Sequence, residues 1–226
     1  MFDSVLKIVA PHHCYGCDKI GDVLCDNCKY DIISEPYTGC IVCTKPSPTK
    51  GICLSCVVPY EQAWCVGERE GNLKGLVDDF KFSHVRAAAD ALVSLLDSSI
   101  PELPNETIVV SVPTIMPHIR RRGYDHAALL AKKFAKRRKL PYRNALGRMT
   151  NTVQHGASRA DRIRQAAEAF RIRERLDNSP PVLLIDDIVT TGESLANAAK
   201  LLREAGAGTV FVGVIAKQPF HSRPQG

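Results

Sequence analysis

Two adjacent carboxylates and a short hydroxyl-rich loop stand close together in the C-terminal part of the chain. The carboxylates are Asp186 and Asp187, and the loop that follows consists of Thr190, Thr191, Gly192, Glu193 and Ser194. Free backbone N–H groups, hydroxyl donors and the positive end of a helix dipole together form a site for a phosphate dianion. Gly192 lets the backbone approach such an anion because it has no Cβ. Carboxylates bind sugar hydroxyls or a divalent cation instead, so the combination predicts a pocket for a phosphorylated sugar. The alternative is an ordinary strand-to-helix turn with a threonine cap.

Regular elements must hold these groups in place. Val182–Ile185 is a continuous apolar run bounded by prolines, as is typical of a strand buried on both faces of a parallel sheet, and we expect it to end at the carboxylates. Leu195–Ala205 predicts a helix that ends at Gly206, and Thr209–Ala216 predicts a second strand. No GxxxxGK[ST] sequence occurs in the chain, which argues against a P-loop nucleotide hydrolase.

The preceding part of the chain supplies further strands and helices. The predicted strands are Ala63–Gly67 and Thr107–Val112, and the predicted helices are Leu73–Phe82, Val85–Leu96 and Asp125–Lys139. The segment Met116–Gly123 is expected to be a basic loop, and it contains Arg120, Arg121 and Arg122. Ligands of open α/β sheets bind at the carboxyl ends of strands. Because guanidinium groups pair with phosphate oxygens in a bidentate fork, this loop is expected to bind pyrophosphate.

Eight of the nine cysteines form CxxC pairs, a spacing that suits metal ligation. The first cluster has the pattern CxxC–x7–CxxC and the second CxxC–x9–CxxC; their cysteines are Cys14, Cys17, Cys25 and Cys28, and Cys40, Cys43, Cys53 and Cys56. Two such turns complete a tetrahedral four-thiolate zinc site, so we expect two structural zinc ribbons in tandem. An iron–sulfur cluster or redox dithiols are the alternatives, and pairing between the two halves is also open. Cys65 has no CxxC partner and is expected to be a packed residue.

Composition and charge narrow the class of protein. The 226 residues suit one α/β domain with a small appendage, and we expect a double zinc ribbon over residues 1–60 and the main domain over residues 61–226. No apolar run is long enough to span a membrane, and we expect a cytoplasmic protein whose cysteines bind metal rather than form disulfides. Residues 113–176 hold 17 of the 30 lysines and arginines but only 4 of the 24 acidic residues, which indicates an anionic partner for that region.

The stretch Val182–Leu195 resembles the phosphoribosyl diphosphate (PRPP) motif of type I phosphoribosyltransferases. The resemblance implies that Asp186 and Asp187 hold the ribose 2- and 3-hydroxyls, that Thr190–Ser194 hold the 5-phosphate, and that the arginine loop binds pyrophosphate together with Mg²⁺. It also implies the fold class α/β, a type I phosphoribosyltransferase-like, largely parallel sheet of about five strands with helices on both faces. The N-terminal zinc ribbon would be an appendage to that sheet.

Over almost its full length the chain resembles the ComF competence family (ComFC-like). The shared features are the tandem CxxC pairs, then Phe80-Lys81-Phe82, Arg121-Arg122-Gly123-Tyr124 and the PRPP motif, in this order. The chain has Asp125 and His126 where the family usually has Asn and Gln. The family is associated with natural transformation, in which imported single-stranded DNA passes into the cytoplasm.

The resemblance implies a phosphoribosyltransferase involved in DNA uptake, which displaces Mg²⁺-bound pyrophosphate from PRPP and uses Asp186, Asp187 and Arg121 in catalysis. The alternative is a non-catalytic accessory protein that binds PRPP or single-stranded DNA. A DNA groove needs aromatic stacking platforms, and the candidates are Tyr124, Phe134 and Tyr142. A third hypothesis is a docking factor for a DNA-translocating ATPase. Residues 148–170 are expected to form either a lid that excludes water or a plain surface helix.

Overall fold

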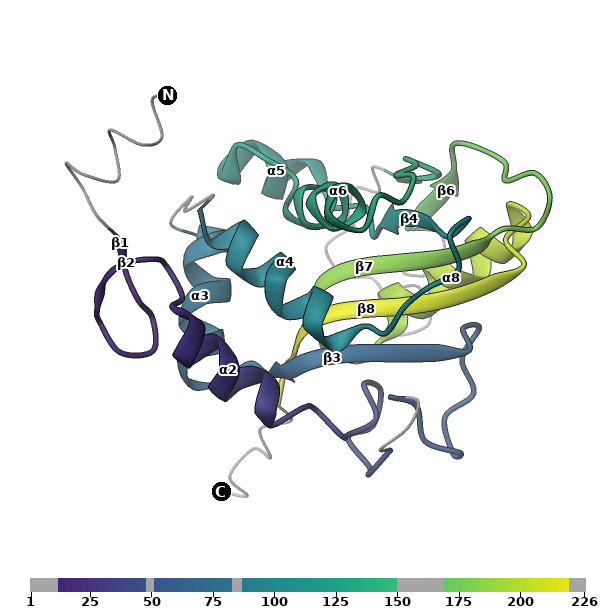
Figure 1. Ribbon diagram of the computed structural model, residues 1–226. Coiled ribbons are helices and arrows are strands. Elements are labelled where there is room, and N and C mark those ends of the chain that lie inside the picture. The colour runs from purple at the N-terminus through teal and green to yellow at the C-terminus, as the bar shows by residue number, and fades with distance from the viewer. Residues whose placement is uncertain (1–11, 48–50, 83–86, 150–168, 220–226) are drawn as a thin grey trace, which may run out of the picture.

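The centre of the molecule is a four-stranded sheet in which every neighbouring pair of strands is parallel (Figure 1). The computed structural model describes residues 12–47, 51–82, 87–149 and 169–219. The strands, in spatial order, are β3 (Gln62–Glu68), β8 (Thr209–Lys217), β7 (Pro181–Val189) and β4 (Ile108–Ser111). The predicted parallel sheet is confirmed, with four strands rather than about five in the described part of the chain.

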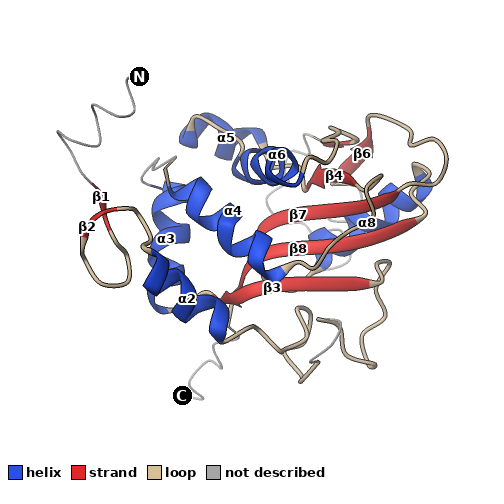
Figure 2. Ribbon diagram, in the orientation of Figure 1, coloured by secondary structure: helices blue, strands red, loops and turns tan. Residues whose placement is uncertain are grey.

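Helices cover both faces of this sheet, as Figure 2 shows. They are α3 (Gly71–Phe82), α4 (Ala88–Ser99) and α6 (His126–Arg138), and on the other face α8 (Glu193–Glu204). Leu183 and Ile185 of β7 point into the core with α4 and α6, whereas Val182 and Leu184 point into the core with α8. Because successive strand residues face opposite sides, burial on both sides requires the continuous apolar run that the sequence contains.

The acidic pair lies inside β7, not after its end as expected. The strand continues to Val189 because Asp186 pairs with Val214 of β8, and Ile188 pairs with Ala216. The partner strand therefore extends β7 past the apolar run that indicated it. The other predicted strands and helices in the described residues begin and end within a few residues of their expected positions.

The predicted basic loop is a short helix, α5 (Met116–Arg122). Pro117 stands in its first turn, where a missing N–H costs nothing. Gly123 ends it with a left-handed φ of 77°, and its N–H donates to the Ile119 carbonyl over 2.8 Å. The loop expectation is therefore wrong, and this changes which of the arginines can face the sheet.

The remaining elements are small. They are β1 (His12–His13), β2 (Ile20–Gly21), α2 (Asp26–Ser34), β5 (Leu146–Arg148) and β6 (Phe170–Ile172). Strands β5 and β6 form an antiparallel pair apart from the main sheet. Cys28 lies in the first turn of α2, where a ribbon turn was expected. Among the described residues, none of the helices has the length and apolar character that crossing a membrane requires.

Candidate functional site

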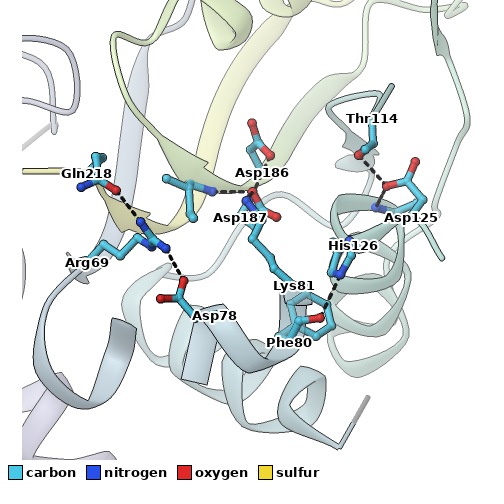
Figure 3. A network of polar contacts seen from close by, with 12 residues as sticks. Arg69, Asp78, Phe80, Lys81, Thr114, Asp125, His126, Asp186, Asp187 and Gln218 are labelled. Carbon is cyan, nitrogen blue, oxygen red and sulfur yellow. Dashed lines mark hydrogen bonds and ion pairs between the residues drawn. The ribbon is translucent and has the colours of Figure 1, made fainter. Parts of the chain in front are cut away.

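The acid pair, Asp186 and Asp187, is the polar centre at one end of the sheet (Figure 3). Asp187 is buried, and its Oδ1 lies 2.9 Å from the Nζ of Lys81, in the last turn of α3. The same oxygen accepts a hydrogen bond from the Ile188 N–H over 2.7 Å, and Asp186 Oδ1 accepts one from the Asp187 N–H over 2.8 Å. The two carboxylates are therefore held in fixed orientations before any ligand binds.

The protonation of Asp186 depends on its surroundings. Burial and the adjacent charge of Asp187 raise the pKa of Asp186 well above its usual range, while the Lys81 ammonium opposes that rise. A divalent cation or hydroxyl donors at the pair would favour the charged form again. The acid pair can therefore accept groups of that kind.

The predicted loop, residues 190–194, connects β7 to α8 and is mostly exposed. Gly192 is the buried residue before α8, with a left-handed φ of 81°. Glu193 begins the helix, and its N–H lies 3.5 Å from Thr191 Oγ1. The first N–H groups of an α-helix have no partner within it. Thr190 and Thr191 are exposed in this loop, which begins three residues after Asp187.

The three predicted arginines do not act together, because α5 is helical. Arg122 is buried, and the pKa of its guanidinium is lowered by burial and raised by the charge of Asp187. Residues two apart in a helix point about 200° apart, so Arg120 lies on the far side of α5, where it is exposed. Arg121 shares a face with His118 at i and i+3. The structure brings Arg122 toward the acid pair, whereas Arg120 and Arg121 are exposed, and Arg121 lies near Arg122 and His118.

Lys81 and Arg148 complete the set of cations at the site, and neither was predicted as a site residue. Partial burial lowers the pKa of His118, and the nearby charges of Arg122, Arg121, Lys81 and Arg148 lower it further. These cations therefore converge from α3, α5 and β5. The sequence feature that could have indicated Lys81 as a site residue is its place in the Phe80-Lys81-Phe82 segment, which is part of the family resemblance.

Arg148, the last residue of β5, lies near Asp186 of the acid pair. Its guanidinium carbon lies 5.1 Å from the centre of the Phe170 ring, and its NH1 group lies 3.5 Å from the Pro113 carbonyl oxygen. Burial lowers the pKa of Arg148, and the charge of Asp186 raises it. Arg148 and Phe170 bound the segment predicted as a lid, but residues 150–168 lie outside the described part of the chain.

The last turn of α3, which carries Lys81, is held by the start of α6. The Phe80 carbonyl accepts hydrogen bonds from the Tyr124 hydroxyl over 2.5 Å and from His126 Nε2 over 2.8 Å. The rings of Phe80 and His126 also pack edge to face, with centroids 4.8 Å apart. Asp125 caps α6, since its Oδ1 accepts from the Ala128 N–H over 3.1 Å. The two departures from the family pattern therefore have structural roles beside the site.

The cysteines form two separate groups, each built from its own two CxxC pairs. Within each group the sulfur atoms lie within 4.8 Å of one another, so the described structure contains no pairing between the halves. Two sulfur separations are 3.7 Å, between Cys17 and Cys25, and 3.4 Å, between Cys43 and Cys53. A tetrahedral zinc site with Zn–S bonds of about 2.3 Å needs sulfur atoms about 3.8 Å apart.

The chemistry of the sulfur atoms also suits a metal ion. Cys14 Sγ accepts hydrogen bonds from the N–H groups of Gly16 and Cys25 over 3.4 and 3.3 Å. Burial raises the pKa of Cys14, but the bonds from Cys25 and Gly16 outweigh it and lower that pKa to about 6. Each group can therefore hold zinc through four thiolates. Cys65 lies buried in β3, outside both groups, as expected of a packed residue.

The basic face of α6 is largely paired with α4. Lys133 Nζ lies 2.7 Å from Asp90, and both Arg137 and Arg138 form ion pairs with Asp97. Arg138 also donates to the carbonyl groups at the C-terminal end of α4. These cations join two helices, so they are not a purely solvated face.

The three aromatic candidates for stacking on DNA bases are also engaged within the protein. Phe134 is fully buried, and the Tyr124 hydroxyl donates to the Phe80 carbonyl. The Tyr142 hydroxyl lies 3.2 Å from Ser111 Oγ, and the Lys132 Nζ lies over the Tyr142 ring, 5.4 Å from its centre. None of the three rings is presented to solvent as a free platform.

Comparison with known proteins gives relatives that match over most of the chain. No family model matches the chain. Competence protein F of Haemophilus influenzae is 28% identical over 228 residues, which cover 91% of this chain and 95% of that protein. DNA utilization protein YhgH of Salmonella typhi is 31% identical over 175 residues, covering 74% of this chain and 77% of that protein. Among solved structures, adenine phosphoribosyl transferase from Trypanosoma brucei matches with a TM-score of 0.39 and 13% identity, over 64% of this chain and 75% of that one.

Proposed function

The chain belongs to the family of DNA utilization protein YhgH and competence protein F, and from that premise we propose that it binds PRPP with Mg²⁺ at the acid pair and the loop of residues 190–194. One observation carries the proposal. A buried carboxylate on a central strand, Asp187, is ion-paired with Lys81 and faces the Arg122 charge, directly before an exposed threonine loop that opens a helix. A ligand with hydroxyls at its centre and phosphates at both ends complements that order of groups.

Each part of PRPP has a partner in this arrangement. Asp186 and Asp187 accept hydrogen bonds from the ribose hydroxyls, and the N–H groups and hydroxyls of residues 190–194 donate hydrogen bonds to the 5-phosphate. Arg121, Arg122 and Lys81 face the pyrophosphate. When bound, Mg²⁺ supplies positive charge to the pyrophosphate oxygens, and the carboxylates are the groups of this chain that suit it.

The reaction that such a site supports is transfer of the phosphoribosyl group. The bond between the anomeric carbon and a pyrophosphate oxygen breaks, an acceptor forms the new bond, and pyrophosphate leaves with the bonding electrons. The anomeric centre passes through an oxocarbenium-like state. Arg121 and Arg122 would stabilise the charge that develops on the leaving pyrophosphate, because guanidinium groups pair with phosphate oxygens in a bidentate fork.

The test is calorimetric titration of the zinc-loaded protein with PRPP, with and without Mg²⁺ and with pyrophosphate as a competitor. We expect Mg²⁺-dependent binding that pyrophosphate displaces. Asp187→Asn and Thr191→Val should each abolish it while leaving the folded structure intact by circular dichroism. Asp177→Asn, at an exposed carboxylate before β7, is the matched control and should bind like the wild type. Retained binding in both site variants would show that the pocket is assigned to the wrong residues.

A second candidate is a non-catalytic role in handling single-stranded DNA, and its support is that the relatives are named for competence and DNA utilization. The pairing of Arg137 and Arg138 with Asp97 weakens this candidate, because the two guanidinium groups already share that carboxylate and Arg138 also donates to carbonyl groups at the C-terminal end of α4. The exposed Lys132 and Lys136 are the better probes. If α6 binds DNA, replacing both lysines with alanine should weaken binding in fluorescence anisotropy and reduce its dependence on salt. An unchanged affinity would exclude α6 as the binding surface.

A further inference from the structure

The second cluster, Cys40, Cys43, Cys53 and Cys56, lies against the loop of residues 190–194, although the two are far apart in sequence. Ile41 is fully buried in the same apolar core as Val189 and Leu195, which flank the loop. Val42 reaches the loop itself, since a Cβ built on Gly192 would lie 3.4 Å from Val42 Cγ2. The turn between the first two cysteines of this cluster therefore forms one wall of the loop.

A buried lysine makes the second link between the cluster and the loop. Lys217, the last residue of β8, is fully buried, and its Nζ donates a hydrogen bond to the Thr190 carbonyl. Burial lowers the pKa of Lys217, and the neighbouring side chains of Cys65, Cys40, Cys43 and Glu68 oppose that shift. A buried ammonium requires compensating charge nearby. Cys40 and Cys43 of the second cluster are thus among the groups close to the Lys217 ammonium, together with Cys65 and Glu68.

We infer that the second cluster positions the loop of residues 190–194 through Val42 and Lys217, so that metal binding at this cluster and phosphate binding at the loop are energetically coupled. The inference rests on the proposed function in one respect, that the loop is where phosphate binds. Val42 and Lys217 are positioning residues. The Val42 side chain limits where Gly192 can lie, and the Lys217 ammonium fixes the direction of the Thr190 carbonyl.

The first cluster provides an internal control because it packs elsewhere. Its neighbour Tyr15 contacts α3, with a ring carbon 3.1 Å from the position of a Cβ on Gly75, and its hydroxyl donates to Asp79. Val23 belongs to the core on the α4 and α6 side, whereas Ile41 belongs to the core on the α8 side. Loss of metal from the first cluster should therefore leave the loop unchanged.

The first experiment is hydrogen exchange of peptides that cover residues 190–195, in the full-length protein without any ligand. We expect faster exchange when the second cluster is removed by Cys53→Ser and Cys56→Ser, and no change when the first is removed by Cys14→Ser and Cys17→Ser. Lys217→Met keeps all eight ligands and should also speed exchange. Lys200→Met, at an exposed position on α8, is its matched control. Exchange at the wild-type rate in Lys217→Met would overturn the inference, even if the cysteine variants misfold.

The second experiment measures zinc release to a chromophoric chelator, with ribose 5-phosphate as the ligand. Coupling is reciprocal, so the ligand should slow release from the second cluster by about fivefold or more and leave the first unchanged. Zinc release is expected in two kinetic phases, one for each cluster, and the cysteine variants show which phase belongs to which cluster. The ligand effect should disappear in Lys217→Met.

Calorimetry on the same samples separates failure of the inference from failure of the proposed function. If ribose 5-phosphate binds but both phases of zinc release are unchanged, or are slowed equally, the coupling is refuted and the binding site stands. If neither ribose 5-phosphate nor PRPP with Mg²⁺ binds, the proposed function fails. The ligand-free exchange experiment then decides the inference by itself.

Discussion

Replacing His126 with glutamine tests how α6 holds the end of α3 that carries Lys81. His126 is 1% exposed, and its Nε2 donates to the Phe80 carbonyl. Its Nδ1 has no hydrogen-bond partner among the described residues, so a proton added there would be buried without an acceptor. Burial is the main cause that lowers the pKa of His126 from 6.5 to about 4; Arg122 and Lys81 add to it, and Asp187 opposes it.

The shift sets the sign and the size of a pH effect on stability. In the unfolded chain the histidine takes up a proton near pH 6.5, whereas in the folded state it does so only near pH 4. Its contribution to stability is therefore fully present above pH 6.5 and is lost as the pH falls toward 4. At pH 4.5 the loss amounts to about 2.5 kcal/mol, since one pKa unit corresponds to about 1.4 kcal/mol. For a chain of this size that is roughly 5–10 °C in melting temperature.

Urea unfolding of wild type and His126→Gln between pH 7.5 and 4.5 measures this effect. The glutamine amide can still donate to the Phe80 carbonyl, so the two proteins should be similarly stable at pH 7.5 and differ by about 2.5 kcal/mol at pH 4.5, in favour of the variant. Carboxylates titrate in both proteins and cancel in the difference. Tyr124→Phe removes the other donor to that carbonyl and should lower stability equally at every pH. Parallel curves for wild type and His126→Gln would refute the reasoning.

Three further predictions concern the acid pair and the second cluster. Asp186→Asn should raise the melting temperature at pH 8, because the raised pKa of Asp186 means that its negative charge destabilises the folded state there. The gain should vanish near pH 4, where the carboxyl is protonated in the folded state. A lower melting temperature at pH 8 would contradict this prediction. Lys81→Met should lower the free energy of unfolding in urea by about 3 kcal/mol, because it leaves Asp187 buried and unpaired. Adding Asp187→Asn to Lys81→Met should restore most of that stability. Additive losses in the double variant would argue against the ion pair. Gly51→Ala should reduce the bound zinc from two ions per chain toward one. Position 51 has a φ of 61°, and the Cβ of an alanine there would lie 2.1 Å from the Ala63 carbonyl oxygen. An unchanged zinc content in metal analysis would exclude that clash.

Local sequence patterns were sufficient for the parts of the fold that rest on local physics. The apolar run Val182–Ile185 indicated a strand buried on both faces, and the spacing of the CxxC pairs indicated two separate tetrathiolate groups. Both depend on neighbouring residues alone. The helix at Met116–Arg122 could also have been found, because Pro117 and Gly123 are the start and stop signals that helices use.

Contacts between distant segments could not be read in the same way. The length of β7 depends on pairing with β8, and the ion pair between Lys81 and Asp187 depends on how α3 packs beside the sheet. Lys217 offered one usable signal, a cation directly after an apolar strand, at the same edge of the sheet as the acid pair. The roles of Asp186, Asp187 and residues 190–194 in binding remain predictions that the experiments above test.

The position of β8 has a consequence for biosynthesis. It lies between β3 and β7, yet it follows both in the chain. While the ribosome is still making the preceding residues, β3 has no partner strand and β7 is paired only with β4. The cysteines of both clusters emerge much earlier, so metal can be acquired before the sheet is complete. A nascent chain halted before residue 209 could bind metal ions but would expose the two strand edges that β8 covers in the complete sheet, and such edges recruit other chains into aggregates.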